Sequence, residues 1–108
     1  MNGRVGSTSH LKVLVWVVYD IQSTPRRSRV AKACKGQGLY RVQKSVFLGT
    51  LNPNQMDELA MRCNDLIDAE HDSVYLFPFC DADFKKIKLV GQAFDKELVT
   101  DEILSKFF

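Results

Sequence analysis

Residues 11–20 read LKVLVWVVYD, a run of β-branched and aromatic side chains that ends in an acid. Such a run is typical of a central β-strand that is buried on both faces of a sheet. Its apolar part, residues 13–19, is far too short to span a bilayer, so it indicates a soluble protein without a membrane span. The sequence therefore predicts a middle strand that places Asp20 at its carboxyl end.

The segments that follow this strand alternate between helical and extended patterns. A first helix is predicted to begin with Thr24 as its N-cap and Pro25 at the first helical position, and to run to about Lys35. Residues 39–51 are rich in strand formers. Their alternation breaks near Ser45, which predicts two short strands rather than one straight strand.

A second helix and two further strands complete the pattern. Asn52 is predicted to cap the helix that begins at Pro53, with Gln55 as its capping-box partner. Residues 73–80 (SVYLFPFC) predict a strand whose proline restricts it to the sheet edge or the strand end. Residues 86–90 (KIKLV) alternate like a half-exposed strand.

The predicted order of elements is β-α-β-β-α-β with one extra short strand near the C-terminus. This is the order of the ferredoxin-like α+β fold, which we assign to residues 11–91 as one domain. Residues 1–10 show no periodicity and are predicted to be a disordered leader, and residues 92–108 form a C-terminal tail. Both helices lie on one face of such a sheet, so the bare second face predicts a homodimer.

The charges divide unevenly along the chain, although the net charge is only +2. Residues 1–50 carry nine Lys or Arg and a single acid, Asp20, for a net charge of +8, whereas residues 51–108 carry −6. An asymmetry of this size indicates a polyanionic partner for the basic half. The alternative is a fold that brings the two halves together and cancels their charges.

The cysteine pattern narrows the class of protein further. Three cysteines, an odd number, lie far apart without a CxxC pair or neighbouring histidines. This argues against a disulfide framework or a zinc site and favours a reducing compartment, so we expect a cytoplasmic protein. The sequence also contains no phosphate-binding Gly loop and no evident Ser-His or Cys-His pair.

Three arginines crowd the first turn of the first predicted helix, at positions 26, 27 and 29. The helix dipole disfavours cations there, by about 0.3–1 kcal/mol each, and free backbone N–H groups at the same end suit a phosphate. A compensating anion is therefore expected, and a nucleic-acid backbone would provide it. The alternative is a salt bridge to the acidic second helix.

Asp20 is unusual because it is the only acid among these cations and ends the central strand. Ligands gather at that end of open α/β sheets. One carboxylate alone is a poor Mg²⁺ site, because the ion needs about six oxygens. A two-fold axis nearby would bring two copies of Asp20 together around a shared Mg²⁺, which would activate water for attack on a phosphodiester. The alternative is an acid that ends the strand or pairs with an arginine.

Three motifs stand at a characteristic spacing: VYDI at 18–21, RRSRVAK at 26–32 and GLYRVQKSVF at 38–47. Together they resemble the CRISPR-associated Cas-two family, small adaptation proteins known as endoribonucleases. The resemblance covers about residues 11–91. It implies a ferredoxin-like homodimer whose last strand, residues 86–90 here, pairs with the partner subunit.

The resemblance also implies roles for the residues that match the family motifs. Asp20 would be the metal-binding aspartate, contributed once by each subunit to a shared Mg²⁺. The residues that it implies in cleavage or backbone binding are Tyr19, Asp20, Arg27, Arg29, Arg41 and Phe47. The residues that we expect to bind nucleic acid are Arg26, Arg27, Arg29, Lys32, Arg41 and Lys44.

Two functions stay open at this point. In the first, the chain is a Mg²⁺-dependent endonuclease that acts on RNA or double-stranded DNA, with arginines steadying the transition-state charge. In the second, it is a nuclease-silent scaffold that grips DNA phosphates and bridges dimers of the CRISPR integrase during spacer acquisition. The tail is expected to pack on the partner subunit or on the integrase. A ferredoxin-like metabolite sensor is a third alternative, which the clustered arginines disfavour.

Overall fold

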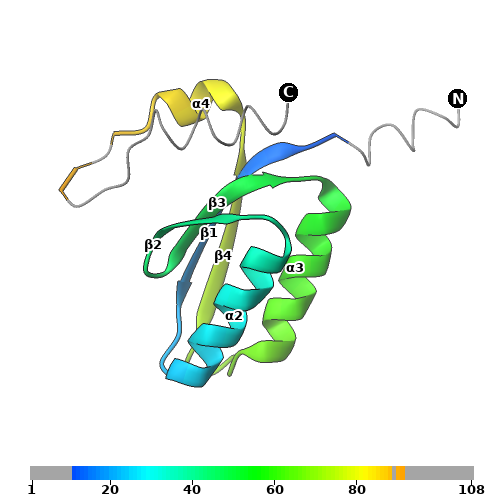
Figure 1. Cartoon of the computed structure of the whole chain (residues 1–108), viewed down its shortest axis with the longest axis vertical. Helices are drawn as coiled ribbons and strands as arrows, with labels where there is room; N and C mark the ends of the chain where they lie inside the picture. Colours follow the sequence, from blue (N-terminus) through cyan, green and yellow to red (C-terminus); the bar gives the residue numbers. More distant parts are fainter. Residues whose placement is uncertain (1–10, 89, 92–108) are drawn as a thin grey trace, which may run out of the picture.

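The computed structural model describes residues 11–88, 90 and 91. The strands among them form one four-stranded antiparallel sheet. Its strands are β1 (Val13–Asp20), β2 (Tyr40–Gln43), β3 (Val46–Leu51) and β4 (Ser73–Phe79). β1 lies in the middle, between β3 and β4, and β2 forms the edge beside β3 (Figure 1). The predicted central strand is therefore confirmed, whereas the predicted leader (residues 1–10) and tail (residues 92–108) lie outside the described residues.

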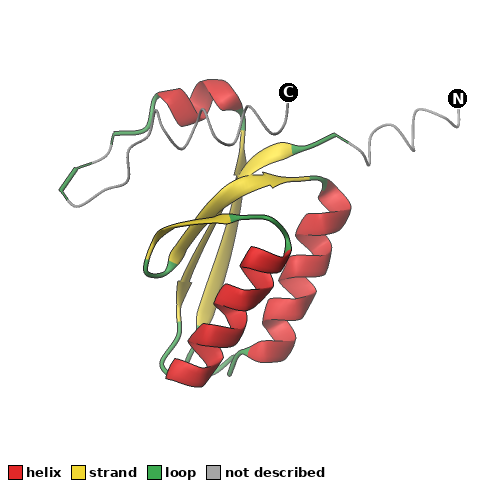
Figure 2. Cartoon of the chain, viewed as in Figure 1, coloured by secondary structure: helices red, strands yellow, loops and turns green. Residues whose placement is uncertain are grey.

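Two helices cover one face of the sheet (Figure 2). They are α2 (Thr24–Gly36), between β1 and β2, and α3 (Pro53–Leu66), between β3 and β4. Alternate residues of β1, namely Val15, Val17 and Tyr19, are buried on this face in the main core. The predicted α+β order β-α-β-β-α-β is confirmed. No helix in the described part of the chain combines the length and hydrophobicity that a membrane crossing requires.

The helix starts follow side-chain capping, with one shift from the prediction. Asn52 and Gln55 form the predicted capping box at the start of α3, with bonds of 2.8 and 2.9 Å. In α2, the cap is Ser23 and not Thr24, because the Ser23 hydroxyl accepts from the backbone N–H of Arg26 at 3.3 Å. Thr24 is already helical, and its hydroxyl accepts a bond from the Arg27 guanidinium instead.

A short helix, α4 (Asp81–Lys85), follows β4 directly. None of the described residues of the range 86–90 lies in a strand of this chain, so the predicted strand is absent from its sheet. The pairing of this segment with a partner subunit stays a prediction. Phe84 of α4 is fully buried against Leu14 and Leu48, and the partly buried Ile87 packs on the same cluster. The helix therefore covers one end of the sheet face that α2 and α3 leave open.

The rest of this second face keeps exposed aromatic rings. Tyr75 and Phe77 of β4 expose about half of their surface, 53% and 50%, and their rings stack with centroids 5.9 Å apart. Their partners across the ladder are Val18 and Trp16 of β1. An apolar surface of this kind is what the homodimer prediction depends on, and the dimer itself stays a prediction.

Candidate nucleic-acid interface

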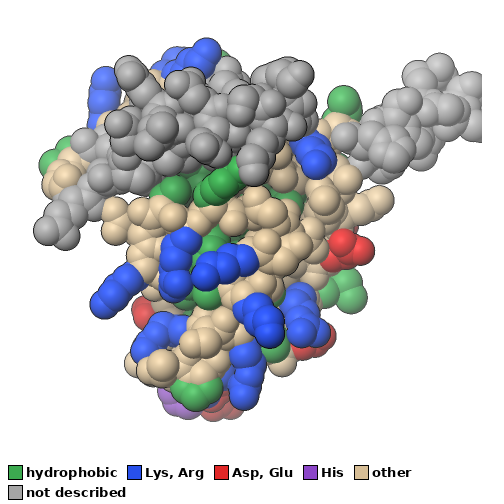
Figure 3. Space-filling view, viewed as in Figure 1, with side chains coloured by type: hydrophobic (Ala, Val, Ile, Leu, Met, Phe, Trp, Pro, Cys, Tyr) green, Lys and Arg blue, Asp and Glu red, His purple; other side chains and the backbone are tan. Residues whose placement is uncertain are grey.

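A groove of about 620 Å³ opens between α2 and the turn that joins β2 to β3. The cations that line it are Arg27, Lys32, Lys35, Arg41 and Lys44, and we name it the basic groove. Figure 3 shows Lys and Arg side chains gathered over this part of the surface. No acid from the described part of the acidic half, residues 51–88, 90 and 91, lines the groove. A concentration of cations in an open groove suits the phosphates of a nucleic-acid backbone.

Asp20 is the last residue of β1, and its side chain is exposed. Among the described residues that line the basic groove, it is the only acid. The described residues contain no group of three His, Cys, Asp or Glu side chains placed to hold one metal ion. One chain therefore presents a single carboxylate beside the groove, and Mg²⁺ would need a further anchor, such as a second copy of Asp20 or a phosphate.

Arg27 lines the groove and braces the loop between β1 and α2. Its Nη1 donates to the backbone carbonyl of Ile21 at 2.8 Å, and its Nη2 donates to Oγ1 of Thr24 at 2.6 Å. A guanidinium carries five N–H donors, so these two bonds leave others for a phosphate. The side chain is thus held in place before any ligand binds.

Arg41 is held by the hairpin and by the Phe47 ring beneath its guanidinium. Its Nη2 donates to the carbonyl of Lys44 at 2.8 Å, and its guanidinium lies 5.5 Å from the centroid of Phe47. Phe47 is fully buried and stacks on Tyr19 with ring centroids 6.3 Å apart. Neither ring lines the groove. Any effect of these two residues on cleavage is therefore expected to act through the position of Arg41.

Tyr19 also fixes the turn that carries Lys44. Its hydroxyl donates to the Lys44 carbonyl at 3.2 Å and accepts a long contact of 3.4 Å from Nη2 of Arg41. Burial raises the pKa of the Tyr19 phenol, and the nearby Arg41 offsets only part of that rise. The phenol therefore stays protonated at neutral pH and acts as a hydrogen-bond donor, not as a base.

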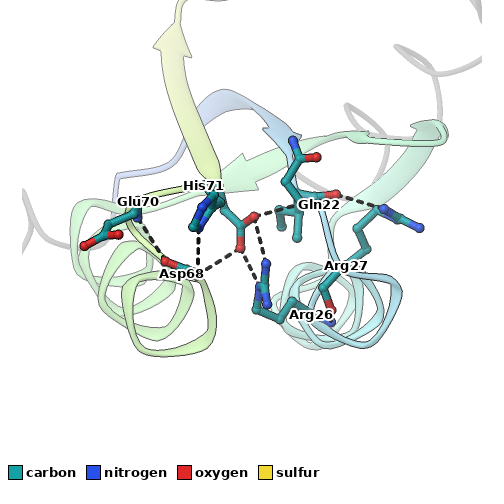
Figure 4. Close-up of polar contacts among 9 residues, drawn as sticks. Gln22, Arg26, Arg27, Asp68, Glu70 and His71 are labelled. Carbon is teal, nitrogen blue, oxygen red and sulfur yellow. Dashed lines mark hydrogen bonds and ion pairs between the residues drawn. The ribbon is translucent and has the colours of Figure 1, made fainter.

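Arg26 points away from Arg27 and binds Asp72 instead (Figure 4). Nε of Arg26 lies 2.6 Å from Oδ2 of Asp72, and Nη2 lies 3.2 Å from Oδ1. The Asp72 carboxylate also accepts bonds from the backbone N–H groups of Gln22 and Asp68, both at 2.9 Å. The bonds from Arg26, and then those backbone bonds, hold the pKa of Asp72 well below its usual range.

Asp72→Asn is expected to remove the contribution of the ionised Asp72 carboxylate to the free energy of unfolding. The unaltered chain loses this contribution only at acidic pH. Because the pKa of Asp72 is lower in the folded chain than its ordinary value of about 3.9, ionisation favours folding above that value. The contribution fades as the pH falls below about 4 towards the lower folded pKa. The difference in free energy of unfolding between the two proteins should therefore be constant from about pH 7 to 5 and shrink below about pH 4.

Urea unfolding followed by circular dichroism at several pH values would measure this difference. The pKa of Asp68 is also lowered, mainly by His71, but Asp68 is present in both proteins and its contribution cancels. A difference that stays unchanged down to about pH 2 would contradict the assignment.

The three arginines of the first turn therefore do not form one anion site. Arg27 lines the basic groove, whereas Arg26 pairs with Asp72. Arg29 is exposed and is not among the residues that line the groove. For Arg26, the compensating anion is a side chain of the same chain, which is the alternative that the sequence left open. Asp72 lies in the loop after α3, however, and not in the helix itself.

The sheet, the helices and the whole basic groove fall within one family match. Residues 13–87 match the family model described as CRISPR associated protein Cas2. The chain belongs to the Cas2 family. The family resemblance inferred from the three sequence motifs is thus confirmed, and the metabolite sensor is set aside.

Relatives and a solved structure agree with membership of the Cas2 family. The chain is 41% identical over 64 residues to the CRISPR-associated endoribonuclease Cas2 1 of Archaeoglobus fulgidus, covering 59% of this chain and 68% of that protein. It is 34% identical over 71 residues to a CRISPR-associated endonuclease Cas1/endonuclease Cas2 fusion of Thermoproteus tenax, covering 66% of this chain and 27% of the fusion. A Cas2 crystal structure superposes with a TM-score of 0.65 at 36% identity, covering 77% of this chain and 91% of that one.

The structure adds groove residues to those expected from the Cas2 motifs. Lys35 and Ser28 line the groove together with Lys32, and the three stand at the i, i+4 and i+7 positions of one helix face. This spacing is visible in the sequence, so Lys35 could have been predicted from it. Asp72 offered no such signal, because its contact with Arg26 joins residues 46 positions apart.

Proposed function

We propose that this Cas2 family member is a metal-dependent endonuclease of CRISPR adaptation that hydrolyses phosphodiester bonds in RNA or double-stranded DNA. The observation that carries the proposal is the basic groove with Asp20 as the one acid among its described lining residues. The names endoribonuclease and endonuclease, carried by the relatives from A. fulgidus and T. tenax, support this class of reaction. All three cysteines are free thiols in the structure, which agrees with a cytoplasmic setting.

We assign the metal site to Asp20 of two copies of the chain. The Asp20 side chain is exposed and therefore open to a second carboxylate, and carboxylate oxygens are ligands that Mg²⁺ prefers. The bare sheet face with Tyr75 and Phe77 is the apolar surface on which we expect the second copy to pack. A Mg²⁺ ion bound there would supply an activated water for attack on phosphorus.

The chain's own residues bind and orient the phosphodiester. Arg27 and Arg41 are already braced by backbone carbonyls, so their remaining donors can stabilise the charge that develops on the phosphate oxygens. Lys32, Lys35 and Lys44 neutralise neighbouring phosphates along the groove. The protonated Tyr19 keeps the Lys44 turn in place.

Binding to nucleic acid is expected to weaken steeply with salt and to be nearly independent of sequence. Five groove cations that each neutralise one phosphate predict a slope of about −4.5 for log K against log salt. Fluorescence anisotropy with two labelled duplexes of unrelated sequence, between about 50 and 300 mM KCl, would measure it. The variant Lys32→Ala/Lys44→Ala should reduce the slope by about 1.8.

The control for this variant is Lys86→Ala/Lys88→Ala, which removes two exposed charges outside the groove. It should leave the slope nearly unchanged. An equal loss in both double variants would show that the basic groove is not the binding surface. A slope near zero in the unaltered protein would contradict nucleic-acid binding altogether.

Cleavage of labelled single-stranded RNA and duplex DNA, with Mg²⁺ and with EDTA, tests the reaction itself. Products that form only with Mg²⁺ are the expected result. Tight, salt-sensitive binding without products under any of these conditions would overturn the endonuclease proposal.

The second candidate function is a nuclease-silent scaffold that binds DNA and joins the CRISPR integrase. The single carboxylate in the described groove favours it, because one chain lacks a complete metal-ligand set among its described residues. The T. tenax relative, in which Cas1 and Cas2 are fused, supports association with Cas1. In this role the groove cations keep their phosphate contacts, whereas Asp20 is dispensable.

A further inference from the structure

The carboxylate of Asp72 joins two segments that lie far apart in the sequence, residues 22–26 and residues 68–72. Figure 4 labels its partners Gln22, Arg26 and Asp68. It accepts one bond from the backbone N–H of Gln22, before α2, and one from that of Asp68, after α3. Arg26, in the first turn of α2, contributes two more donors. The Asp72 side chain has no exposed surface. Water therefore cannot readily replace these bonds, and the carboxylate fixes the segments to one another.

The Asp72 carboxylate and its hydrogen-bond partners lie next to Asp20 in the fold. Ser73, the neighbour of Asp72, is the Cα partner of Asp20 in the ladder between β1 and β4. Gln22, which donates to Asp72, lies two residues beyond Asp20 in the chain. The backbone that carries the exposed Asp20 carboxylate is therefore held by the ladder on one side and by Asp72 on the other.

Arg27 holds the same loop from the side of the groove. Its guanidinium donates to the Ile21 carbonyl and to the Thr24 hydroxyl. Consecutive arginines thus grip the loop between β1 and α2 from two sides, Arg26 through Asp72 and Arg27 directly (Figure 4). A shift of this loop would move Asp20 and Arg27 together.

We propose that Asp72 and Arg26 form a positioning pair that sets the loop after β1 and so places Asp20 and Arg27 for reaction. The proposal rests on the proposed function of the basic groove. Neither partner lines that groove, and the Arg26 guanidinium is bound to a carboxylate without exposed surface. Arg26 therefore acts on the position of the groove residues, not as a phosphate contact.

Asp72→Asn separates positioning from simple electrostatics, because the two predict opposite signs. Removal of a carboxylate makes the chain more positive and by itself would strengthen binding to a polyanion. A displaced loop instead lowers kcat by about 10- to 100-fold, because small errors in placement are costly. The salt slope of binding should change little, since all five groove cations remain, whereas duplex affinity should fall because Arg27 moves with the loop.

The Arg26 variants complete the comparison. Arg26→Met is expected to lower kcat as much as Asp72→Asn does, and the double variant should lose nothing further, because the two residues act as one unit. Arg26→Lys keeps the charge and a single donor nitrogen in place of the two that contact Asp72, so it should recover part of kcat. If Asp72→Asn does not fold, the two Arg26 variants alone decide the question.

His71→Asn is the matched control in the same loop. It removes the 2.9 Å contact between His71 and Asp68 and leaves every bond of Asp72 in place, so it should retain the unaltered kcat. Amide hydrogen exchange gives a readout that does not need activity. The N–H groups of Gln22 and Asp68 are expected to exchange faster in folded Asp72→Asn.

An unchanged kcat in folded Asp72→Asn would overturn the proposal. So would a fall of about 0.9 in the salt slope of Arg26→Met, which would mark Arg26 as a phosphate contact. If the unaltered protein does not cleave at all, the endonuclease proposal fails, and duplex affinity still tests the positioning pair. The affinity of Asp72→Asn should fall if the loop places Arg27, and a rise would show that only charge matters.

Discussion

Asp20→Asn is expected to reduce cleavage by at least about 10³-fold while leaving nucleic-acid binding intact. Asp20 is the one acid among the described groove residues, and a neutral amide is a poor ligand for Mg²⁺. The five groove cations remain, so affinity for duplex DNA should be unchanged or slightly higher. Single-turnover cleavage and anisotropy on the same preparations would measure both quantities.

The matched control is Asp57→Asn, an exposed acid on α3 outside the groove, which should cleave normally. Mixtures of the unaltered protein and Asp20→Asn add a test of the shared site. If one metal needs Asp20 from both subunits, only dimers with two unaltered copies cleave, and activity follows the square of the unaltered fraction. Cleavage that survives Asp20→Asn would contradict the assignment, and a linear dependence in the mixtures would contradict sharing.

The parts of the fold that local patterns determine were predictable from the sequence. The run at residues 11–20 specified the central strand, and Asn52 with Gln55 specified the start of α3. The stretch after β4 was not predictable in the same way. Phe84 turns α4 onto the sheet because Leu14 and Leu48 lie beneath it. The local alternation of residues 86–90 carries no trace of those distant contacts.

The residues of the candidate site were likewise predictable only where local sequence patterns determine their position. Arg27 and Arg41 stand in local motifs, and the structure places both in the basic groove. The sequence predicted the same role for Arg26 and Arg27. Adjacent residues of a helix point about 100° apart, however. The Arg26 side chain binds the carboxylate of Asp72, which is distant in the sequence. The burial of Phe47 also depends on packing, since its ring lies in the main core on the face of β3 that the helices cover.

Phe47→Ala is expected to destabilise the domain by about 3–5 kcal/mol, the usual range for a fully buried phenylalanine. The ring stacks on Tyr19 and lies below the Arg41 guanidinium, so its loss leaves a cavity in the main core. Domains of this size are stable by only about 5–15 kcal/mol. Urea unfolding followed by circular dichroism should therefore show a much lower midpoint.

Phe47→Leu separates packing from a direct part in cleavage. Leucine fills most of the same space, and Arg41 keeps its 2.8 Å bond to the Lys44 carbonyl. The lost contact between guanidinium and ring is worth about 0.5–1 kcal/mol at an exposed site. Cleavage by the folded variant should therefore fall by no more than about fivefold. A loss of cleavage as large as that expected for Asp20→Asn would mean that the ring itself contacts the substrate. This would contradict the structure, in which the ring is completely buried.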